Sequence, residues 1–361
     1  MKNDAILKAK TKLYAKMRLM QKLPMKLLII KTSSLGDVIH CLPIIHDIRA
    51  HFANAQIDWV VEESFAVIPR MHAGVNQVFT VAMRRWKKQI FNPNTWAEIG
   101  EFKKLIKQNQ YDVIIDTQGL LKSALITMQA HGLKHGYDKD SIREPIASWF
   151  YDKTYNISYN QHAVTRNRAL AAMSLGYEIP KNAPDYGINT TNNASASRID
   201  AGLQACYLLL KSEGYYIVAL HGTSRAAKLW PVENWVDLGR ELAKQNLSLA
   251  LPWASEAELA RANAIASQLK NAQVGNCIVL PKLSIAQIAS VISHAKAAIG
   301  VDTGLSHLAT ALNIPTIAIY TDTNPALTGV MGGAFKPAIN LGNIAETPSV
   351  NDVLTSLKQI L

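Results

Sequence analysis

The sequence predicts an α/β protein made of two consecutive Rossmann-like, doubly wound halves. Short apolar runs alternate with helical segments along most of the chain, a pattern typical of parallel sheets covered by helices. The polar, proline-containing stretch 177–200 interrupts this alternation, and we expect the interdomain linker in its first part. With 361 residues, the chain is long enough for two domains of roughly 150 residues each.

The first half begins at Met25, where the nearly continuous apolar run 26–31 predicts a buried parallel strand. A turn at 32–36 and a helical stretch to about Phe52 follow. Further strands are expected at 57–61, 78–81 and 112–116, and helices at 98–109 and 119–131.

In the second half the alternation resumes after the linker, and a final helix is expected at about 350–361. The strands of this half are expected near 216–221, 247–252, 277–280, 297–301 and 315–320. We therefore expect a first domain, a second domain and a C-terminal helix at residues 25–180, 181–345 and 346–361.

Residues 1–24 differ from the rest because they hold seven Lys or Arg residues against the single acid Asp4. Apolar side chains recur near helical spacing between the lysines, and Pro24 would end a helix there. This pattern predicts a basic amphipathic helix that could lie on an anionic membrane surface. A disordered basic tail and a start codon placed too early remain alternatives.

The composition restricts the function classes. The three cysteines, Cys41, Cys206 and Cys277, are far apart and lack CxxC spacing, which favours a reducing compartment without disulfides or a cysteine metal site. No apolar run approaches the ~18 residues of a membrane span, and we expect no secretory signal. The net charge of +11 indicates an anionic partner. Nucleic acid is not expected, since no aromatic-rich basic stripe or known module occurs.

The first candidate site is the turn 31–38, KTSSLGDV, between the first strand and its helix. Gly36 allows the backbone to approach a ligand closely. Asp37 would lie in the first helical turn facing a cleft, where a carboxylate can accept a proton from an attacking hydroxyl. An aspartate that only complements the helix dipole is the alternative.

Two turns of the second half suit a diphosphate. In 300–307, GVDTGLSH, Asp302 or Thr303 is expected to cap a helix whose free N–H groups could bind phosphate, with His307 one turn further on. In 221–231, hydroxyl and ammonium groups could donate to phosphate oxygens. Those groups are Thr223, Ser224 and Lys228. An ordinary capped helix with a core histidine, and a solvated loop lysine, are the alternatives.

Together these stretches resemble the ADP-heptose:lipopolysaccharide heptosyltransferase family, glycosyltransferase family 9. The likeness covers nearly everything from Met25 on, and the subtype heptosyltransferase I depends mainly on KTSSLGD and RRWKK. The segments that carry it are KTSSLGDVIHCLP (31–43), WVVEESFAVIP (59–69), RRWKK (84–88), DTQGLLKSA (116–124), REPIASWFY (143–151), KLWP (228–231), LPW (251–253) and VDTGLSHL (301–308).

The resemblance implies a GT-B fold, with two Rossmann-like domains facing across a cleft. The first domain would bind the acceptor and the second ADP-heptose, in an inverting transfer with Asp37 as general base and Lys228 stabilising the leaving diphosphate. The positions that match the family's donor site are Thr223, Ser224, Lys228, Glu258, Leu283, Asp302, Thr303, Gly304 and His307.

The implied acceptor is the Kdo residue of Kdo–lipid A, and the implied location is peripheral, on the cytoplasmic face of the inner membrane. The acceptor-binding candidates are Ser34, Gly36, Arg84, Arg85, Lys87, Lys88, Lys122 and Arg143. The basic run 84–88 is expected in a loop. The number and phosphorylation of the Kdo residues, the donor stereochemistry and the oligomeric state stay open.

No metal or other cofactor is expected. Asp138 and Asp140 have the D-x-D spacing that holds a divalent ion in other glycosyltransferases, but here the segment is read as a polar turn. The alternatives to this function are a GT-B nucleotide-sugar epimerase or hydrolase, and a heptosyltransferase acting on a later core acceptor.

Overall fold

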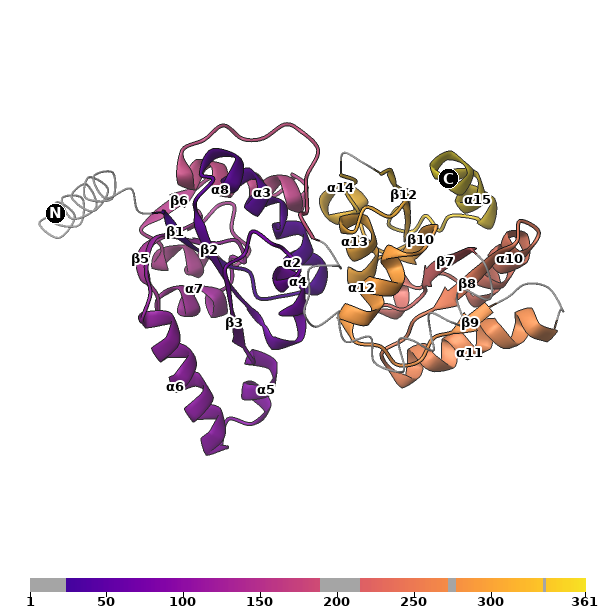
Figure 1. The fold of residues 1–361 in the computed structure, drawn as a ribbon, viewed down its shortest axis with the longest axis horizontal. Helices are drawn as coiled ribbons and strands as arrows, with labels where there is room; N and C mark the ends of the chain where they lie inside the picture. The colour runs from indigo at the N-terminus through magenta and orange to yellow at the C-terminus, as the bar shows by residue number, and fades with distance from the viewer. Residues whose placement is uncertain (1–23, 189–214, 272–276, 334–335) are drawn as a thin grey trace, which may run out of the picture.

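The computed structural model describes residues 24–188, 215–271, 277–333 and 336–361. These residues form two six-stranded sheets in which all strand pairs are parallel, one in each half of the chain (Figure 1). The α/β, GT-B architecture expected from the sequence is confirmed. The predicted helix at 1–24 and the second part of the linker stretch lie outside the described residues.

The first sheet has the strand order β3-β2-β1-β4-β5-β6 and the second has the order β12-β11-β10-β7-β8-β9. The first comprises β1 (Lys26–Ile30), β2 (Gln56–Glu62), β3 (Gln77–Val81), β4 (Gln110–Asp116), β5 (His131–Tyr137) and β6 (Lys153–Tyr155). The second comprises β7 (Tyr215–Leu220), β8 (Leu247–Leu251), β9 (Cys277–Val279), β10 (Ala297–Val301), β11 (Thr316–Tyr320) and β12 (Ala338–Gly342). When the strands are numbered within each half, both sheets have the same order, 3-2-1-4-5-6. In each sheet the chain first adds strands on one side of the first strand and then on the other. Parallel sheets of this kind bind ligands at that switch point, beyond the carboxyl ends of the strands.

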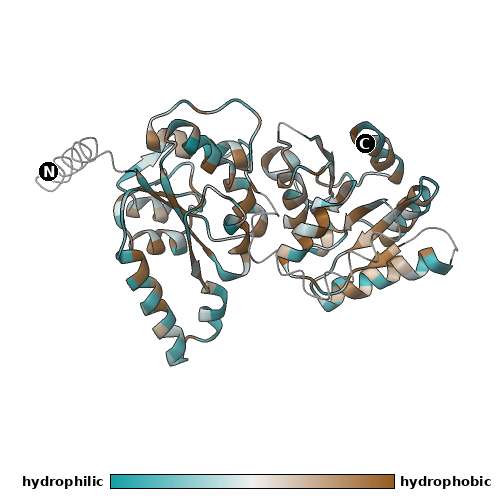
Figure 2. Ribbon diagram, in the orientation of Figure 1, coloured by the Kyte–Doolittle hydropathy of each residue, from teal (hydrophilic) through white to brown (hydrophobic). Residues whose placement is uncertain are grey.

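Helices cover both sheets. In the first half these are α2 (Leu35–Cys41), α3 (Pro43–His51), α4 (Val67–Arg70), α5 (Met83–Lys88), α6 (Pro93–Lys107), α7 (Leu121–Thr127) and α8 (Ala163–Leu175). In the second they are α10 (Val232–Ala243), α11 (Glu256–Asn271), α12 (Ile285–Ser293), α13 (Gly304–Ala311), α14 (Pro325–Thr328) and α15 (Val350–Ile360). Figure 2 shows hydrophobic residues concentrated on the strands between these helices, in agreement with their burial.

The helix expected to run to Phe52 is broken in two. Leu42 separates α2 from α3, and Pro43 is the first residue of α3. Proline suits a first helical position because it has no N–H to bond and its φ angle is already helical.

The halves meet where α2 packs on α13 (Figure 1). A Cβ atom on Gly36 would lie 3.0 Å from Cδ2 of His307, and one on Gly304 would lie 2.8 Å from Cβ of Leu35. Each glycine therefore accommodates a side chain of the opposite helix. This contact brings the first turns of the two helices together.

The Asp138–Asp140 segment is a polar turn after β5. The Asp138 carboxylate accepts hydrogen bonds from the Ser141 hydroxyl at 2.6 Å and from the Asn156 amide at 2.8 Å. Across the described residues, no group of three or more His, Cys, Asp or Glu side chains is arranged to hold a metal ion. In that same part of the chain, no helix combines the length and apolar character needed to cross a membrane.

Candidate active site

A cavity of about 440 Å³ lies between the two halves, beyond the carboxyl ends of β1, β7 and β10. Its walls come from both domains. The first half contributes Ser34, Leu35, Gly36, Asp37, His40, Phe65 and Arg84, and the second contributes Thr223, Ser224, Lys228, Asp302, Thr303, Gly304, His307 and Thr328. All three turns singled out in the sequence therefore meet at one site, which we call the cleft.

Asp37 lies in the first turn of α2 on the wall of the cleft. Its Oδ2 accepts hydrogen bonds from the backbone N–H of Ser34 at 2.7 Å and from the Ser34 hydroxyl at 2.8 Å. These bonds orient the carboxylate and use only one of its oxygens. A carboxylate has about four acceptor positions, so it retains capacity to accept a bond from a substrate hydroxyl.

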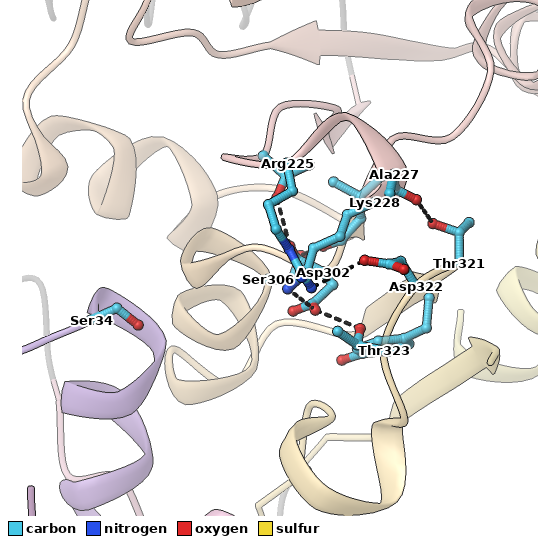
Figure 3. Close-up of polar contacts among 12 residues, drawn as sticks. Ser34, Arg225, Ala227, Lys228, Asp302, Ser306, Thr321, Asp322 and Thr323 are labelled. Atoms are coloured by element: carbon cyan, nitrogen blue, oxygen red, sulfur yellow. Dashed lines mark hydrogen bonds and ion pairs between the residues drawn. The ribbon is translucent and has the colours of Figure 1, made fainter. Parts of the chain in front are cut away.

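In the second half, Lys228 lines the same cavity as Asp37 and is held in a fixed position (Figure 3). Asp302 Oδ2 accepts from the Lys228 ammonium at 2.5 Å and from the Thr323 hydroxyl at 2.6 Å. The Thr223 hydroxyl donates to the backbone oxygen of Asp302 at 3.0 Å. Figure 3 shows Ser34 on the facing helix, across from this network.

Of the two residues that could cap α13, Thr303 occupies the N-cap position. Asp302 uses its carboxylate on Lys228 instead, and within the described structure Thr303, the N-cap residue, makes no side-chain capping bond. The first N–H groups of an α-helix lack partners inside the helix. The first N–H groups of α13 therefore have no side-chain cap, and they border the cleft. They are suited to bind an anionic ligand there.

A histidine pair joins the two halves beneath the cleft. His40 Nε2 on α2 lies 3.0 Å from His307 Nδ1 on α13, and both rings are buried. The Asn167 amide on α8 donates to the backbone oxygen of His40 at 3.1 Å. Burial, followed by the neighbouring His307, lowers the pKa of His40 well below 6.5, and burial lowers the pKa of His307 to about 4. Both rings are therefore neutral near pH 7.

The tautomers of this pair follow from one unpaired atom. His40 Nδ1 is buried and has no hydrogen-bond partner in the part of the chain that is described. An orphaned buried N–H is rarer in proteins than an under-satisfied acceptor, so we infer that His40 carries its proton on Nε2 and donates to His307. His307 then carries its own proton on Nε2, and its ring lines the cleft as a neutral donor.

Acidification should destabilise the folded protein in which His40 and His307 are paired. Because the folded-state pKa values of His40 and His307 are lowered, the unfolded chain binds more protons below about pH 6.5, and stability falls as the pH drops toward 4. Other buried histidines add to the same slope. Lowering the pH from 7.5 to 5 should reduce the Tm of the parent protein more than the Tm of His40→Gln. The expected difference is a few degrees, since 1 kcal/mol corresponds to about 2–4 °C in domains of this size. Scanning calorimetry measures this, and equal slopes would contradict it.

The basic run 84–88, expected in a loop, forms the helix α5 instead. Arg85 pairs with Glu63 at 3.0 Å and with Glu98 at 2.9 Å, and the Trp86 indole donates to Glu98 at 2.7 Å. These partners from other segments neutralise and anchor the helix. Arg85 is thus engaged in ion pairs, whereas its neighbour Arg84 lines the cleft.

The other acceptor candidates are spread over the first half. The guanidinium of Arg84 lies 5.2 Å from the ring centroid of Phe65. The Lys122 ammonium donates to the Ser33 hydroxyl at 3.2 Å, in the turn before α2. Lys87, Lys88 and Arg143 are exposed and are not part of the cleft wall formed by the described residues.

Two donor candidates lie outside the described cleft wall. Glu258 Oε2 accepts from the backbone N–H of Ala254 at 2.7 Å and of Ser255 at 3.1 Å. Its side chain also lies against Gly222, where a Cβ atom would be 2.7 Å from Oε1. Leu283 is buried in the hydrophobic core. Both belong to the second half.

Several residues of the site were missed from the sequence. His40 follows Asp37 by three positions, the spacing of neighbours on one helical face, and that signal could have identified it. Thr323 follows the expected strand 315–320, where the carboxyl ends of parallel strands collect ligands. Nothing in the local pattern pointed to Phe65 or Thr328.

Comparison with known proteins decides the family. The family model described as "Glycosyltransferase family 9 (heptosyltransferase)" matches residues 99–354. The chain belongs to this family. It is a glycosyltransferase, and this family 9 enzyme has the GT-B fold of solved relatives.

The relatives of this family 9 enzyme cover most of its length. It is 42% identical to lipopolysaccharide heptosyltransferase 1 of Pseudomonas aeruginosa, over 88% of this chain and 84% of that protein. It is 43% identical to the Escherichia coli K12 protein of the same name, over 92% of this chain and 100% of that protein. The solved E. coli heptosyltransferase WaaC with ADP matches with a TM-score of 0.80 and 40% identity, over 93% of this chain and 99% of that one.

Proposed function

We propose that this enzyme transfers L-glycero-D-manno-heptose from ADP-heptose to the Kdo residue of Kdo–lipid A, with inversion at the anomeric carbon, in lipopolysaccharide inner-core biosynthesis. Relatives 42–43% identical to it are named lipopolysaccharide heptosyltransferase 1. A second WaaC structure, 38% identical, carries ADP-2-deoxy-2-fluoro heptose. The observation that carries the proposal is the cleft itself, whose walls include Asp37 from one half and Lys228 and the start of α13 from the other. The enzyme would work at the cytoplasmic face of the inner membrane.

In this mechanism the acceptor hydroxyl oxygen attacks the anomeric carbon from the face opposite ADP. Its proton passes to Asp37 as the new C–O bond forms, and the bond between the anomeric carbon and the β-phosphate oxygen breaks. ADP departs with the electron pair of that bond. A positioned base of this kind contributes typically ~10²–10⁴ in rate.

The growing negative charge on the diphosphate would be stabilised by the second half. Lys228 supplies an ammonium group that Asp302 holds in place, and the uncapped N–H groups of α13 supply partial positive charges. Thr223 and Ser224 provide hydroxyl donors, and His307 provides a neutral N–H from Nε2. With these groups in place we propose that the transfer needs no metal ion.

Arg84 and Arg85 should respond differently to substitution. Arg84 borders the cleft, where its guanidinium can pair with a carboxylate or phosphate of the acceptor. We expect Arg84→Ala to raise the acceptor KM roughly tenfold, as for loss of one charge-assisted hydrogen bond, with little change for the donor. Arg85→Ala should instead lower Tm, because Glu63 and Glu98 lose their shared partner. Steady-state kinetics with each substrate varied in turn measures this, and equal KM effects of the two variants would count against it.

The decisive test combines the purified protein, ADP-heptose and Kdo–lipid A in the presence of EDTA, and weighs the lipid by mass spectrometry. A gain of one heptose is expected. ADP release without any lipid mass gain would indicate a nucleotide-sugar hydrolase instead. Transfer only to an acceptor that already carries heptose would indicate a later core step, and activity restored only by magnesium would refute the metal-free mechanism.

A further inference from the structure

A second hollow adjoins the cleft on the first half, between α5 and α6. It measures about 570 Å³. Its apolar lining residues include Trp86, Ile90, Trp96 and Ile99, and two of its cations are Arg84 and Lys122. We call it the α5–α6 groove. Figure 1 shows the two helices side by side on the first half.

The tryptophans of this groove present carbon rather than polar atoms. The Trp86 indole N–H is bonded to Glu98, and the Trp96 indole N–H donates to the backbone oxygen of Ile90 at 2.8 Å. Trp96 is nevertheless 58% exposed and Ile90 49% exposed. Exposed apolar surface that is gathered in one hollow and rimmed by charge marks a binding site.

Two of the three cations that line the groove, Arg84 and Lys122, lie on the side of the cleft, and the third is Lys87. Arg84 belongs to the walls of both hollows. Lys122 reaches the Ser33 hydroxyl in the turn that leads to Asp37. A ligand with an anionic head at these two cations can therefore extend its reacting group into the cleft and its apolar part into the groove.

We propose that the α5–α6 groove holds an acyl chain of the acceptor lipid, with the lipid's anionic head at Arg84 and Lys122. This inference depends on the proposed function, since it requires a lipid-linked acceptor. The hollow has the size of a small-ligand site, typically about 300–1,000 Å³, and a flat bilayer surface would not fill it. A peptide is a poor occupant, because its backbone N–H and C=O groups would lack partners against the apolar walls.

The test compares two acceptors, Kdo–lipid A with its acyl chains and the fully deacylated glycan phosphate, each presented as a monomer below the critical micelle concentration. The double variant Ile90→Thr/Trp96→Gln removes apolar surface but keeps a donor for the Ile90 oxygen. We expect the parent enzyme to have a KM for the acylated acceptor on the order of tenfold lower than for the deacylated one. The double variant should lose this difference, with kcat and the KM of the deacylated acceptor unchanged.

Trp149→Gln is the matched control, because Trp149 is 80% exposed on the same half and is not among the residues that line the groove. It should behave as the parent. If the double variant changes the KM of both acceptors equally or of neither, the acyl-chain proposal is overturned. The same conclusion follows if only binding to vesicles changes, since the groove would then serve the membrane surface.

Failure of the proposed transfer reaction can be distinguished from failure of the acyl-chain proposal. If the parent enzyme transfers heptose to neither acceptor, the transfer proposal fails. Binding of an acyl chain in the groove is then tested separately, by quenching of tryptophan fluorescence. A single-chain phosphatidylglycerol with a brominated acyl chain should quench the parent more than Trp96→Gln, because the bromine atoms would lie beside Trp96. Equal quenching of the two proteins would overturn the acyl-chain proposal.

Discussion

Replacing Asp37 by asparagine is expected to reduce kcat by about 10²–10⁴, the usual contribution of a positioned base. The amide keeps an oxygen that can accept from Ser34, as Oδ2 does now, so the first turn of α2 should stay intact. It cannot take up the proton of the attacking hydroxyl. Donor affinity should change less than about twofold, because the base acts on the acceptor. Single-turnover kinetics together with a donor titration measures both quantities.

Ser34→Ala is the control for Asp37→Asn. It removes the 2.8 Å bond from the Ser34 hydroxyl but leaves the carboxylate and the backbone bond in place. Its kcat should remain within about tenfold of the parent, since only one neutral orienting bond is lost. A fully active Asp37→Asn, or a loss explained by weaker donor binding alone, would remove Asp37 from the mechanism.

Replacing Lys228 by methionine should reduce kcat by about 10²–10³, the loss seen when one charge-stabilising donor is removed, and should also weaken donor binding. The methionine preserves much of the apolar stem but not the charge. Asp302 would then be left beside the diphosphate without its ammonium partner at 2.5 Å, and two anions would oppose each other. Calorimetric titration with ADP and steady-state kinetics test this pair of effects.

Arg225→Met provides the comparison for Lys228→Met. Arg225 is on the same loop and pairs with Asp322 at 3.2 Å, but it is mostly exposed and is not part of the described cleft wall. It should therefore lose little activity. Equal losses in the two variants would mean that the loop responds to charge in general, and not that Lys228 contacts the diphosphate.

The buried parts of the fold were predictable from the sequence, and its edges were less so. The apolar runs that became β1, β8 and β10 are fully or nearly fully buried, as parallel strands are. β5 was missed although it lies inside the first sheet, because its run HGLKHGY is largely polar, and its first residue fell at the end of the helix expected at 119–131. β6 was missed because it has only three residues and lies at a sheet edge. β12, also at an edge, contains polar Asn340 and was missed as well.

Among the helices that were not predicted, α5 and α8 are stabilised by distant partners. α8 buries the charged Arg168, which is compensated by Asp47 on α3 at 2.7 Å and by a hydrogen bond to the backbone oxygen of Asn182 at 2.7 Å. The charges of α5 would repel in isolation, and Glu63 and Glu98 offset them. Pairings of this kind join residues far apart in the chain, so periodicity alone cannot reveal them.

The turns of the site were located from the sequence, but their internal bonding was not. Strand-end position identified the segments around Asp37, Lys228 and Asp302. The choice of Asp302 between capping a helix and holding Lys228 depends on how two loops approach in space. The pairing of His40 with His307 likewise depends on the docking of two domains.

The reciprocal glycine contact between α2 and α13 limits how the enzyme can open. Sliding one half along the other would drive Leu35 into the backbone at Gly304 and His307 into the backbone at Gly36. Rotation about the contact avoids both collisions. We therefore expect the contact to act as a pivot. Because Asp37 is on α2 next to it, the base would move little during opening, while residues farther from the pivot would move through larger arcs.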